Sequence, residues 1–490
     1  MGATDPELEW EFHVDWDNDG SFADEANEAQ YLTDLFVRRG RQVYMRPDGK
    51  GFEHIRPGEI RALLDNIDGR FDSWNTTSAL YPNVVPGRRV RARVTDLNTS
   101  TVWPIFNGRI TDIQPERNNK IDQVRITAVD GSFGLQKRPV NSTLYTDTAA
   151  DALYNVILVA AGWTDSTSIE AASDIVPYWW IPPRQNAMDA IYALADALYG
   201  TPFVGADGTF KVYNRQHSTT AGATLTEAEL LKDVGVKQPW EVVRNYAAVT
   251  AYPLTPVTTV ELWRLGDKPS VEAGDSIELW GEYRYNGVQV PAENVTTPVA
   301  TTDYLVNTAA DGSGTNLTAS CTVTAVKYGS NFKLTLTNNS AFLGYITLLK
   351  VRGDALTSQG TTLIREDAAS QALYEKRDVT FDFPMLQVVS QATDYADFLV
   401  GALASPNPFP RVYVEARPSI QFLDVLDKIE LTLATKGITT ARSFDIGGLE
   451  MQWLSTNGQA VRTTWYLEPA LDDIYWIFTA SLGVSTRFGF

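Results

Sequence analysis

Apolar and polar residues alternate along most of this 490-residue chain, in short runs that Gly, Pro, Asn and Asp interrupt. A period of two is typical of half-buried β-strands joined by turns. In the N-terminal region the runs are Glu9–Val14, Tyr31–Val43, Ile60–Asp65, Arg89–Val94, Ile105–Asp112 and Gln123–Val129. We therefore predict an N-terminal β-barrel or sandwich domain over residues 1–140.

Residues 141–237 change to a helical period. Apolar residues recur three or four positions apart over 153–160 and again over 186–198, where Asn186 is the expected N-cap. The Asp207-Gly208 pair between two short apolar runs predicts a hairpin. This mixture indicates an α/β domain over 141–237.

The rest of the chain returns to a strand pattern. Residues 253–363 are rich in Thr, Val, Asn and Gly and alternate in several runs, which predicts an inserted β-sandwich. The flanking segments 238–252 and 364–490 predict a second β-barrel with two helices, near 364–374 and 391–404. The predicted fold class is mainly β with a smaller α/β part, a multidomain barrel and sandwich protein.

Composition limits the classes of function. A chain of this length exceeds one ordinary domain, and 44% apolar with 21% charged residues is typical of globular proteins. The net charge of −19 repels polyphosphate, so we expect no specific nucleic-acid binding. A single cysteine, Cys321, and three histidines exclude a disulfide framework and a zinc cluster.

We expect that the chain carries no secretion or membrane signal. We expect synthesis in the host bacterial cytoplasm and no stable membrane insertion, because neither a signal peptide nor a long apolar stretch is evident. If the protein acts outside the host cell, it leaves the cell by a route that needs no signal peptide, such as release in a virion.

An acidic segment near the N-terminus has the spacing of a calcium loop. Its candidate ligands are Asp15, Asp17, Asp19, Ser21 and Asp24, with Gly20 at the position of the sharp turn. Calcium prefers hard oxygen ligands in this order. Ala26 stands where such a loop has a bidentate Glu, so Asp24 or Glu25 would have to supply that carboxylate. The alternative interpretation is a solvated acidic turn.

Arginines form two clusters, and three of them alternate on one predicted strand. Arg89, Arg91 and Arg93 therefore share a face. We interpret this row as a subunit interface, since guanidinium groups pair with carboxylates at interfaces. A solvated strand face and a DNA contact are the alternatives. The other cluster consists of Arg38, Arg39, Arg41 and Arg46, and we interpret it in the same way, as guanidinium groups that meet carboxylates of a neighbouring subunit.

Aromatic residues provide further interface candidates. Trp179 and Trp180 lie in the run Tyr178–Pro183, which we interpret as core or subunit-interface packing, with a sugar-stacking platform as the alternative. Trp476 and Phe478 lie in an apolar run near the C-terminus, and burial against a neighbouring subunit would explain it.

No enzyme signature is evident. The chain has no HExxH, GxSxG, GxGxxG, CxxC or Walker-type motif. Two carboxylates distant in sequence could still act together on a glycosidic bond, so a cell-wall hydrolase stays an alternative. We predict a protein that is not an enzyme and that requires no cofactor, apart from Ca²⁺ at the acidic loop.

Several segments occur in an order that resembles tail-hub and minor tail proteins of long-tailed bacteriophages. They are Pro57-Gly58-Glu59, Asp68-Gly69-Arg70-Phe71, Leu80-Tyr81-Pro82-Asn83, Pro86-Gly87-Arg88, Phe106-Asn107-Gly108-Arg109-Ile110, Ala161-Gly162-Trp163, Ala206-Asp207-Gly208-Thr209-Phe210, Asp445-Ile446-Gly447-Gly448-Leu449-Glu450 and Thr463-Thr464-Trp465-Tyr466-Leu467. They cover most of the chain except the predicted insertion. One departure is Glu375, where such proteins often carry Gly.

The resemblance implies a virion tail protein that works by assembly. It would be a ring-shaped hub, usually a homotrimer, between the tail tube or distal tail protein and the tip. Its expected partners are copies of itself, those tail proteins, the tape-measure protein and tip or receptor-binding proteins, and its ring would line the channel for DNA ejection. A carbohydrate- or receptor-binding adhesin is the alternative function.

Overall fold

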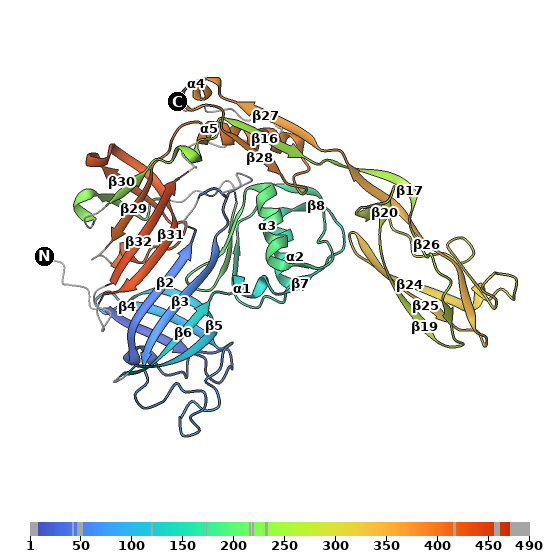
Figure 1. Cartoon of the computed structure of the whole chain (residues 1–490), viewed down its shortest axis with the longest axis horizontal. Helices are drawn as coiled ribbons and strands as arrows, with labels where there is room; N and C mark the ends of the chain where they lie inside the picture. Colours follow the sequence, from blue (N-terminus) through green and yellow to red (C-terminus); the bar gives the residue numbers. More distant parts are fainter. Residues whose placement is uncertain are drawn as a thin grey trace.

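A computed structural model shows a mainly β, multidomain protein with a smaller α/β part, which confirms the predicted fold class. The described residues are 8–41, 44–46, 52–118, 121–172, 174–214, 217, 220–230, 234–414, 418–454 and 461–470. In Figure 1 two curved groups of strands lie at one end of the molecule, the helices lie in the middle and a β-rich arm extends to the other end.

Six antiparallel strands form the N-terminal part of the largest sheet. In spatial order they are β1 (Leu8–Val14), β4 (Arg89–Asp96), β5 (Thr101–Asn118), β6 (Ile121–Val129), β3 (Arg56–Asp65) and β2 (Leu32–Gly40), with the short helix η1 (Glu28–Tyr31) before β2. On β4, Val90, Ala92 and Val94 are buried and the residues between them are partly exposed. The alternation in sequence therefore reflects one packed face and one solvated face.

The C-terminal strands extend this sheet. β2 pairs with β31 (Ile438–Trp453), so that Gly40 lies opposite Gly448. The sheet continues through β32 (Val461–Pro469), β29 (Phe409–Val414) and β15 (Gly235–Lys237), while β30 (Lys428–Leu433) pairs with β31 and carries β14 (Ala223–Thr226). The short helices η5 (Ala434–Lys436) and α6 (Pro418–Gln421) adjoin β30. The two groups of strands predicted as separate barrels thus belong to one 12-stranded sheet.

Glycine permits the close approach of the two groups. A Cβ atom added at Gly448 would lie 2.3 Å from the backbone oxygen of Arg41, and one added at Gly40 would lie 2.4 Å from that of Gly447. Backbones this close leave no room for a side chain. The Gly447-Gly448 pair therefore has a structural role at this junction.

The α/β part lies beside the N-terminal strands. Its helices are α1 (Ser132–Leu135), α2 (Ala150–Ala160) and α3 (Ala187–Leu198), and its strands are β7 (Pro139–Val140), β8 (Tyr145–Ala149), β9 (Thr167–Ile169), β10 (Ile175–Trp179), β11 (Gln185–Asn186), β12 (Thr201–Val204) and β13 (Phe210–Tyr213). Asn186 caps α3 by accepting the backbone N–H of Asp189 at 2.8 Å, as predicted. Gly208, with φ of +86°, makes the predicted turn between β12 and β13.

The predicted range 141–237 also contains strands that pair elsewhere. After η2 (Glu227–Glu229), which the Thr226 and Glu229 capping box begins, β15 pairs with β29, and before it β14 pairs with β30. These two strands therefore belong to the largest sheet and not to the α/β part. The short helix η3 (Trp240–Val242) follows β15.

A three-stranded sheet and two helices cover the α/β part. The strands are β27 (Thr361–Glu366), β16 (Tyr246–Ala251) and β28 (Asp378–Asp382), and the helices are α4 (Ala368–Tyr374) and α5 (Val389–Leu403). The helix predicted near 364 begins only at 368, because Asp367 caps it by accepting the backbone N–H of Ser370 at 2.9 Å. This layer shares one hydrophobic core with α2 and α3, although the sequence suggested that it belongs with the C-terminal barrel.

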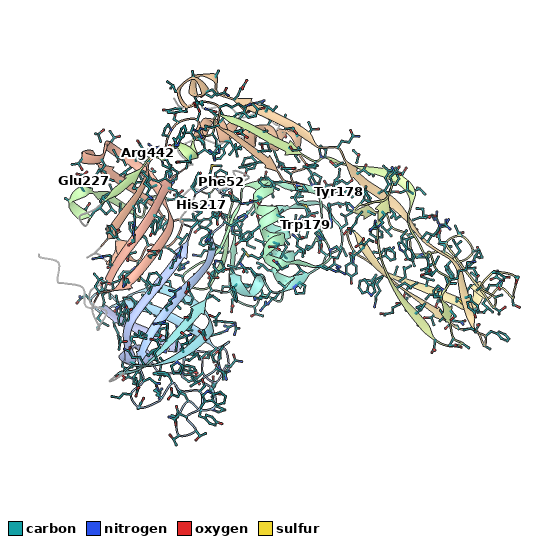
Figure 2. All side chains as sticks on the ribbon, viewed as in Figure 1. Phe52, Tyr178, Trp179, His217, Glu227 and Arg442 are labelled. Carbon is teal, nitrogen blue, oxygen red and sulfur yellow. The ribbon has the colours of Figure 1, made fainter. Side chains whose placement is uncertain are left out.

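Aromatic contacts tie this shared core to the N-terminal region. Phe52 lies between the large sheet and the helices (Figure 2), with its ring centroid 5.0 Å from that of Tyr199 and 5.9 Å from that of Phe381. Segments far apart in sequence therefore meet around a single ring.

The inserted segment forms the β-rich arm. Its elements are β17 (Leu254–Arg264), β18 (Ser270–Val271), β19 (Ser276–Glu282), β20 (Arg284–Tyr285), β21 (Val288–Gln289), β22 (Ala292–Glu293), β23 (Tyr304–Asn307), η4 (Thr318–Ser320), β24 (Cys321–Lys327), β25 (Asn331–Asn338) and β26 (Gly344–Ser358). Buried residues from Leu262 to Ala355 give it a core of its own. Within the described part of the chain, no helix combines the length and the apolar character needed to traverse a bilayer.

Candidate functional site

The acidic loop follows β1 directly. Asp15 is fully buried, and its carboxylate accepts the backbone N–H groups of Asp19 and Gly20, each at 3.1 Å. Asp19 in turn accepts the N–H of Ser21 at 2.7 Å. These bonds turn the backbone so that the acidic side chains face one another, as expected for a short Asp-rich loop.

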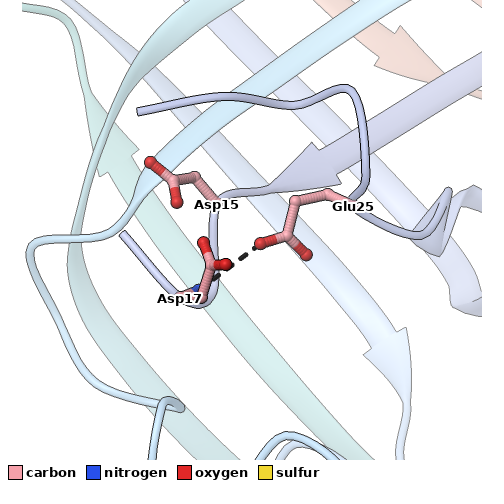
Figure 3. Close-up of side chains that lie close together, drawn as sticks. All are labelled: Asp15, Asp17 and Glu25. Atoms are coloured by element: carbon pink, nitrogen blue, oxygen red, sulfur yellow. Dashed lines mark hydrogen bonds between the residues drawn. The ribbon is translucent and has the colours of Figure 1, made fainter. Parts of the chain in front are cut away.

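Two overlapping groups of carboxylates could hold a metal ion. Asp15, Asp17 and Glu25 form one group and Asp17, Asp19 and Asp24 the other, with potential ligand atoms within 4.8 Å of one another in each. Figure 3 shows the carboxylate of Glu25 pointing toward the loop from the following segment. Of the two residues that the sequence offered for the missing carboxylate, Glu25 belongs to the first group and Asp24 to the second.

The carboxylate of Glu25 is partly buried close to the carboxylates of Asp15 and Asp17. Burial raises the pKa of Glu25, and the nearby charges of Asp17 and Asp15 raise it further, although backbone N–H groups oppose the change. Its Oε1 atom accepts the N–H of Trp16 at 2.6 Å. A hard cation would relieve this repulsion, so the residues present fit Ca²⁺.

The arginine row on β4 has its partners inside the chain. Arg89 pairs with Asp165 at 2.9 Å, and Arg93 pairs with Glu11 at 2.6 Å. The guanidinium group of Arg91 stacks over the ring of Phe22, 4.6 Å from its centroid. β4 lies between β1 and β5 in the sheet. The three arginine side chains therefore have contact partners within the chain and need no second subunit to supply them.

The other arginine cluster joins parts of the chain to one another. Arg39 pairs with Asp424, and it also donates to the backbone oxygen of Val204 at 2.9 Å. The remaining pairs are Arg38 with Glu450 at 3.8 Å, Arg41 with Glu468 at 2.5 Å and Arg46 with Asp196 at 2.7 Å. Carboxylates that we expected on a neighbouring subunit are thus supplied by other segments of the same chain.

The aromatic candidates separate into different environments. Trp179 is 1% exposed and packs in the shared core, so it has no surface left for another subunit and the interface assignment is wrong for this residue. Trp180 is half-buried and lines a cleft beside the inserted arm. Trp476 and Phe478 lie outside the described residues.

The loop between β3 and β4 displays an aromatic surface that the sequence analysis missed. Trp74 is 90% exposed, Ile67 77% and Tyr81 46%. The loop is nevertheless anchored, because Phe71 is fully buried and Arg70 pairs with Glu28 at 2.7 Å. Exposed large apolar side chains on an anchored loop are candidates for a contact with another protein when they gather in one patch. We call Ile67, Trp74 and Tyr81 the tip surface.

Fold and surfaces together define a class of protein. The chain is a mainly β, multidomain protein whose two groups of strands share one sheet, with an independent β-rich arm inserted between them. It exposes large apolar side chains on an anchored loop and carries a net charge of −19, features that suit contact with other proteins.

The fold is that of phage tail proteins. A tail protein from Neisseria meningitidis MC58 is similar with a TM-score of 0.52 and 8% identity, over 94% of this chain and 96% of that one. The 43 kDa tail protein of prophage MuSo2 from Shewanella oneidensis is similar with a TM-score of 0.51 and 8% identity, over 94% and 98%. No protein-family model matches the sequence, and no curated protein matches it. The resemblance found in the sequence is therefore confirmed at the level of the fold.

Proposed function

We propose that this chain is a structural component of a phage tail, a hub of which three copies form a ring. The fold likeness that spans 94% of this chain and nearly the whole of two tail proteins carries the proposal. The hub joins the tail tube or distal tail protein to the tip, and closed symmetry completes the ring. Its role needs no catalytic step.

Charge supports a channel function for the ring. The chain carries −19 at neutral pH, so a lumen lined by several copies repels the phosphates of DNA. DNA and tape-measure protein would then pass without being retained. This property also argues against specific nucleic-acid binding.

Mass photometry of the purified chain tests the proposal. We expect a particle of three times the monomer mass at micromolar concentration, and image averages with threefold symmetry. A chain that stays monomeric at every micromolar concentration, alone and with the distal tail protein of the same particle, would contradict the ring. Hydrolysis of bacterial cell wall by the monomer would instead support the hydrolase alternative.

A further inference from the structure

A cleft of about 1150 Å³ lies between the α/β part and the inserted arm. Trp180 and Arg184, which follow β10, form part of one wall, and Trp263 and Trp280 of the arm form part of the other. Ligand pockets of about 300–1,000 Å³ hold drug-sized molecules. This cleft therefore has room for an extended ligand of several rings.

The two walls are held together by the backbone. Gly329 of the arm donates its N–H to the backbone oxygen of Ser142 at 2.9 Å. A Cβ atom added at Gly329 would lie 2.2 Å from the Cβ of Trp180, so the arm packs directly on the tryptophan at this point. Contacts of this kind fix the position of both walls relative to each other.

Tryptophan rings provide flat apolar surfaces in the cleft. Trp280 is 59% exposed, and the ring of Tyr328 lies parallel to it at a centroid distance of 6.2 Å. Trp263 is half-buried with its ring at 74° to that of Phe332, 5.3 Å away. Neighbouring rings thus hold both indoles in fixed orientations. An oriented and exposed indole can stack against the C–H face of a sugar ring.

Unmatched polar atoms lie in the same cleft. The Oδ1 atom of Asn141 and the Oγ atom of Ser330 are buried and have no hydrogen-bond partner among the described residues, and both residues line the cleft. Buried polar atoms in proteins are normally paired, by protein groups, water or a ligand, so these two atoms mark positions where a ligand in the cleft can supply a partner. A hydroxyl group can donate to Asn141 and can donate to or accept from Ser330.

The cleft carries little net charge, because its charged lining residues are Arg184, Arg284 and Glu282. Arg284 pairs with Glu282 at 3.1 Å, and both residues line the cleft. An arginine already neutralised by a carboxylate gives little attraction to phosphate. Aromatic platforms, hydroxyl partners and a small net charge together fit a polyhydroxylated ring compound.

We propose that this cleft binds an oligosaccharide. One sugar ring stacks on Trp280, and hydroxyl groups of the same chain pair with Asn141 and Ser330. The ligand class is a surface glycan of a cell, presented to a cleft that opens beside the arm. The proposal is independent of the oligomeric state of the hub, which mass photometry measures separately.

Titration of the full chain with neutral tetrasaccharides of glucose, galactose, rhamnose and N-acetylglucosamine tests the proposal, with calorimetry and tryptophan fluorescence as readouts. We expect saturable binding of at least one of them. Trp280→Ala should weaken it by about tenfold or more, since buried aromatic anchors dominate binding energies. Phe342→Ala is the matched control, because Phe342 is 62% exposed on the same arm but does not line the cleft.

The Ser330→Ala variant shows whether the Ser330 hydroxyl binds the sugar or stabilises the fold. Removing an unpaired buried hydroxyl leaves stability unchanged or raises it, whereas loss of its bond to the sugar should weaken binding about fivefold. Three results would overturn the proposal: no saturation by any of the four sugars at millimolar concentration, unchanged affinity of the Trp280→Ala variant, or an equal loss in the Phe342→Ala control. Competition by a short DNA duplex would likewise count against a sugar site.

Discussion

Glu375 adopts a backbone conformation that side chains rarely tolerate. It ends α4 with φ of +61° and ψ of 173°, a region that glycine occupies almost exclusively. Its backbone oxygen accepts a hydrogen bond from Asn245 at 2.8 Å, and Asn245 is fully buried. This bond explains why the chain keeps the strained conformation.

We predict that Glu375→Gly stabilises the protein by about 1 kcal/mol, because the relief of strain exceeds the entropy that glycine adds to the unfolded chain. The free energy of unfolding from urea denaturation is the measurement. Glu375→Gln keeps the side-chain length and the strain, so it should leave stability unchanged. Equal changes in the free energy of unfolding for both substitutions would show that the charge of Glu375, and not its backbone conformation, determines the stability at this position.

Calcium binding at the acidic loop is a second prediction at the level of residues. Ca²⁺ at a hundredfold excess over its Kd should stabilise the chain by about 2.7 kcal/mol, provided that it binds the folded state alone. Differential scanning calorimetry with Ca²⁺ and with EDTA measures the difference. Identical Tm values in the two buffers would contradict the site.

Asp17→Asn is the informative variant for this loop. Asp17 is exposed and belongs to both carboxylate groups, so the substitution should remove the Ca²⁺ response with little effect on the metal-free protein. Asp267→Asn, another exposed carboxylate on the inserted arm, should keep the full response.

Ion pairs hold the elements of the large sheet against the α/β part. The side chain of Arg39 on β2 is only 5% exposed, and it pairs with Asp424, which precedes β30. Asp424 also accepts the backbone N–H of Ala206 at 3.0 Å. Burial raises the pKa of Asp424, but the charge of Arg39 and these hydrogen bonds outweigh burial and lower the pKa below its usual value.

We predict that Asp424→Asn destabilises the protein by about 3 kcal/mol, because Arg39 would remain buried without a counter-charge. The folded-state pKa is depressed, so the contribution of Asp424 is complete at neutral pH and is lost as the pH falls below about 4. Urea denaturation of both proteins at pH 7 and at pH 3 measures this.

A matched control comes from a surface pair. Glu116 pairs with Arg125 at 2.9 Å on an exposed face, and Glu116→Gln should cost less than about 1 kcal/mol at neutral pH. A similar cost for Glu116→Gln and Asp424→Asn would show that burial does not distinguish the two pairs.

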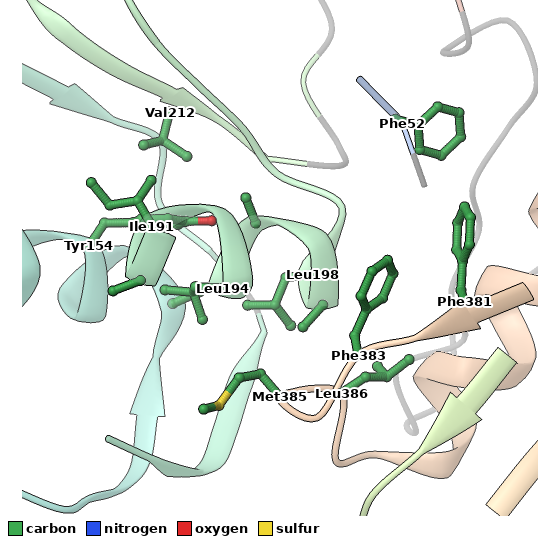
Figure 4. Close-up of a cluster of buried hydrophobic side chains, with 14 of the residues drawn as sticks. Phe52, Tyr154, Ile191, Leu194, Leu198, Val212, Phe381, Phe383, Met385 and Leu386 are labelled. Carbon is green, nitrogen blue, oxygen red and sulfur yellow. The ribbon is translucent and has the colours of Figure 1, made fainter. Parts of the chain in front are cut away.

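Hydrophobic packing supplies the other connection between elements. Leu194 and Leu198 of α3 face Phe383, Met385 and Leu386 from the segment after β28 (Figure 4). These residues are separated by more than a third of the chain and still form one core. The α/β part and the three-stranded sheet therefore behave as one packing unit.

At the scale of the whole molecule, the structure separates surfaces with different tasks. The loop between β3 and β4, which carries the tip surface, lies at the end of the N-terminal strands, and the inserted arm extends toward the other end of the molecule (Figure 1). The cleft is lined by residues of the α/β part and of this arm. A protein of this shape can contact another protein through the loop at one end without involving the arm.

We predict that Trp74→Ala weakens self-assembly or binding of the neighbouring tail protein by about tenfold or more, with the fold intact. Trp74 is 90% exposed, so it contributes little to the packing of a single chain, and exposed tryptophans are frequent binding anchors. Mass photometry measures the assembly and circular dichroism the fold. Trp280→Ala, far from this loop, should assemble normally; unchanged assembly of the Trp74→Ala variant would exclude the tip surface as the contact.

The sequence by itself determined the local features. The strands from β1 to β6, the Asn186 cap, the Asp207-Gly208 turn and the acidic loop all depend on residues within one element or one turn. A period of two and a helix cap follow from backbone geometry, which needs no knowledge of distant partners. Even Glu25 was among the expected ligands, because it lies in the same short segment.

Tertiary structure decided everything that joins distant segments. Local patterns could not assign β14 and β15 to the large sheet, pair Arg39 with Asp424 or place Trp180 and Trp280 in one cleft. Strand pairing and ion pairing need only compatible partners, and this chain offers many strands and 60 acidic residues. The choice among them was made by the packing of four cores at once, a property of the whole chain and not of any window along it.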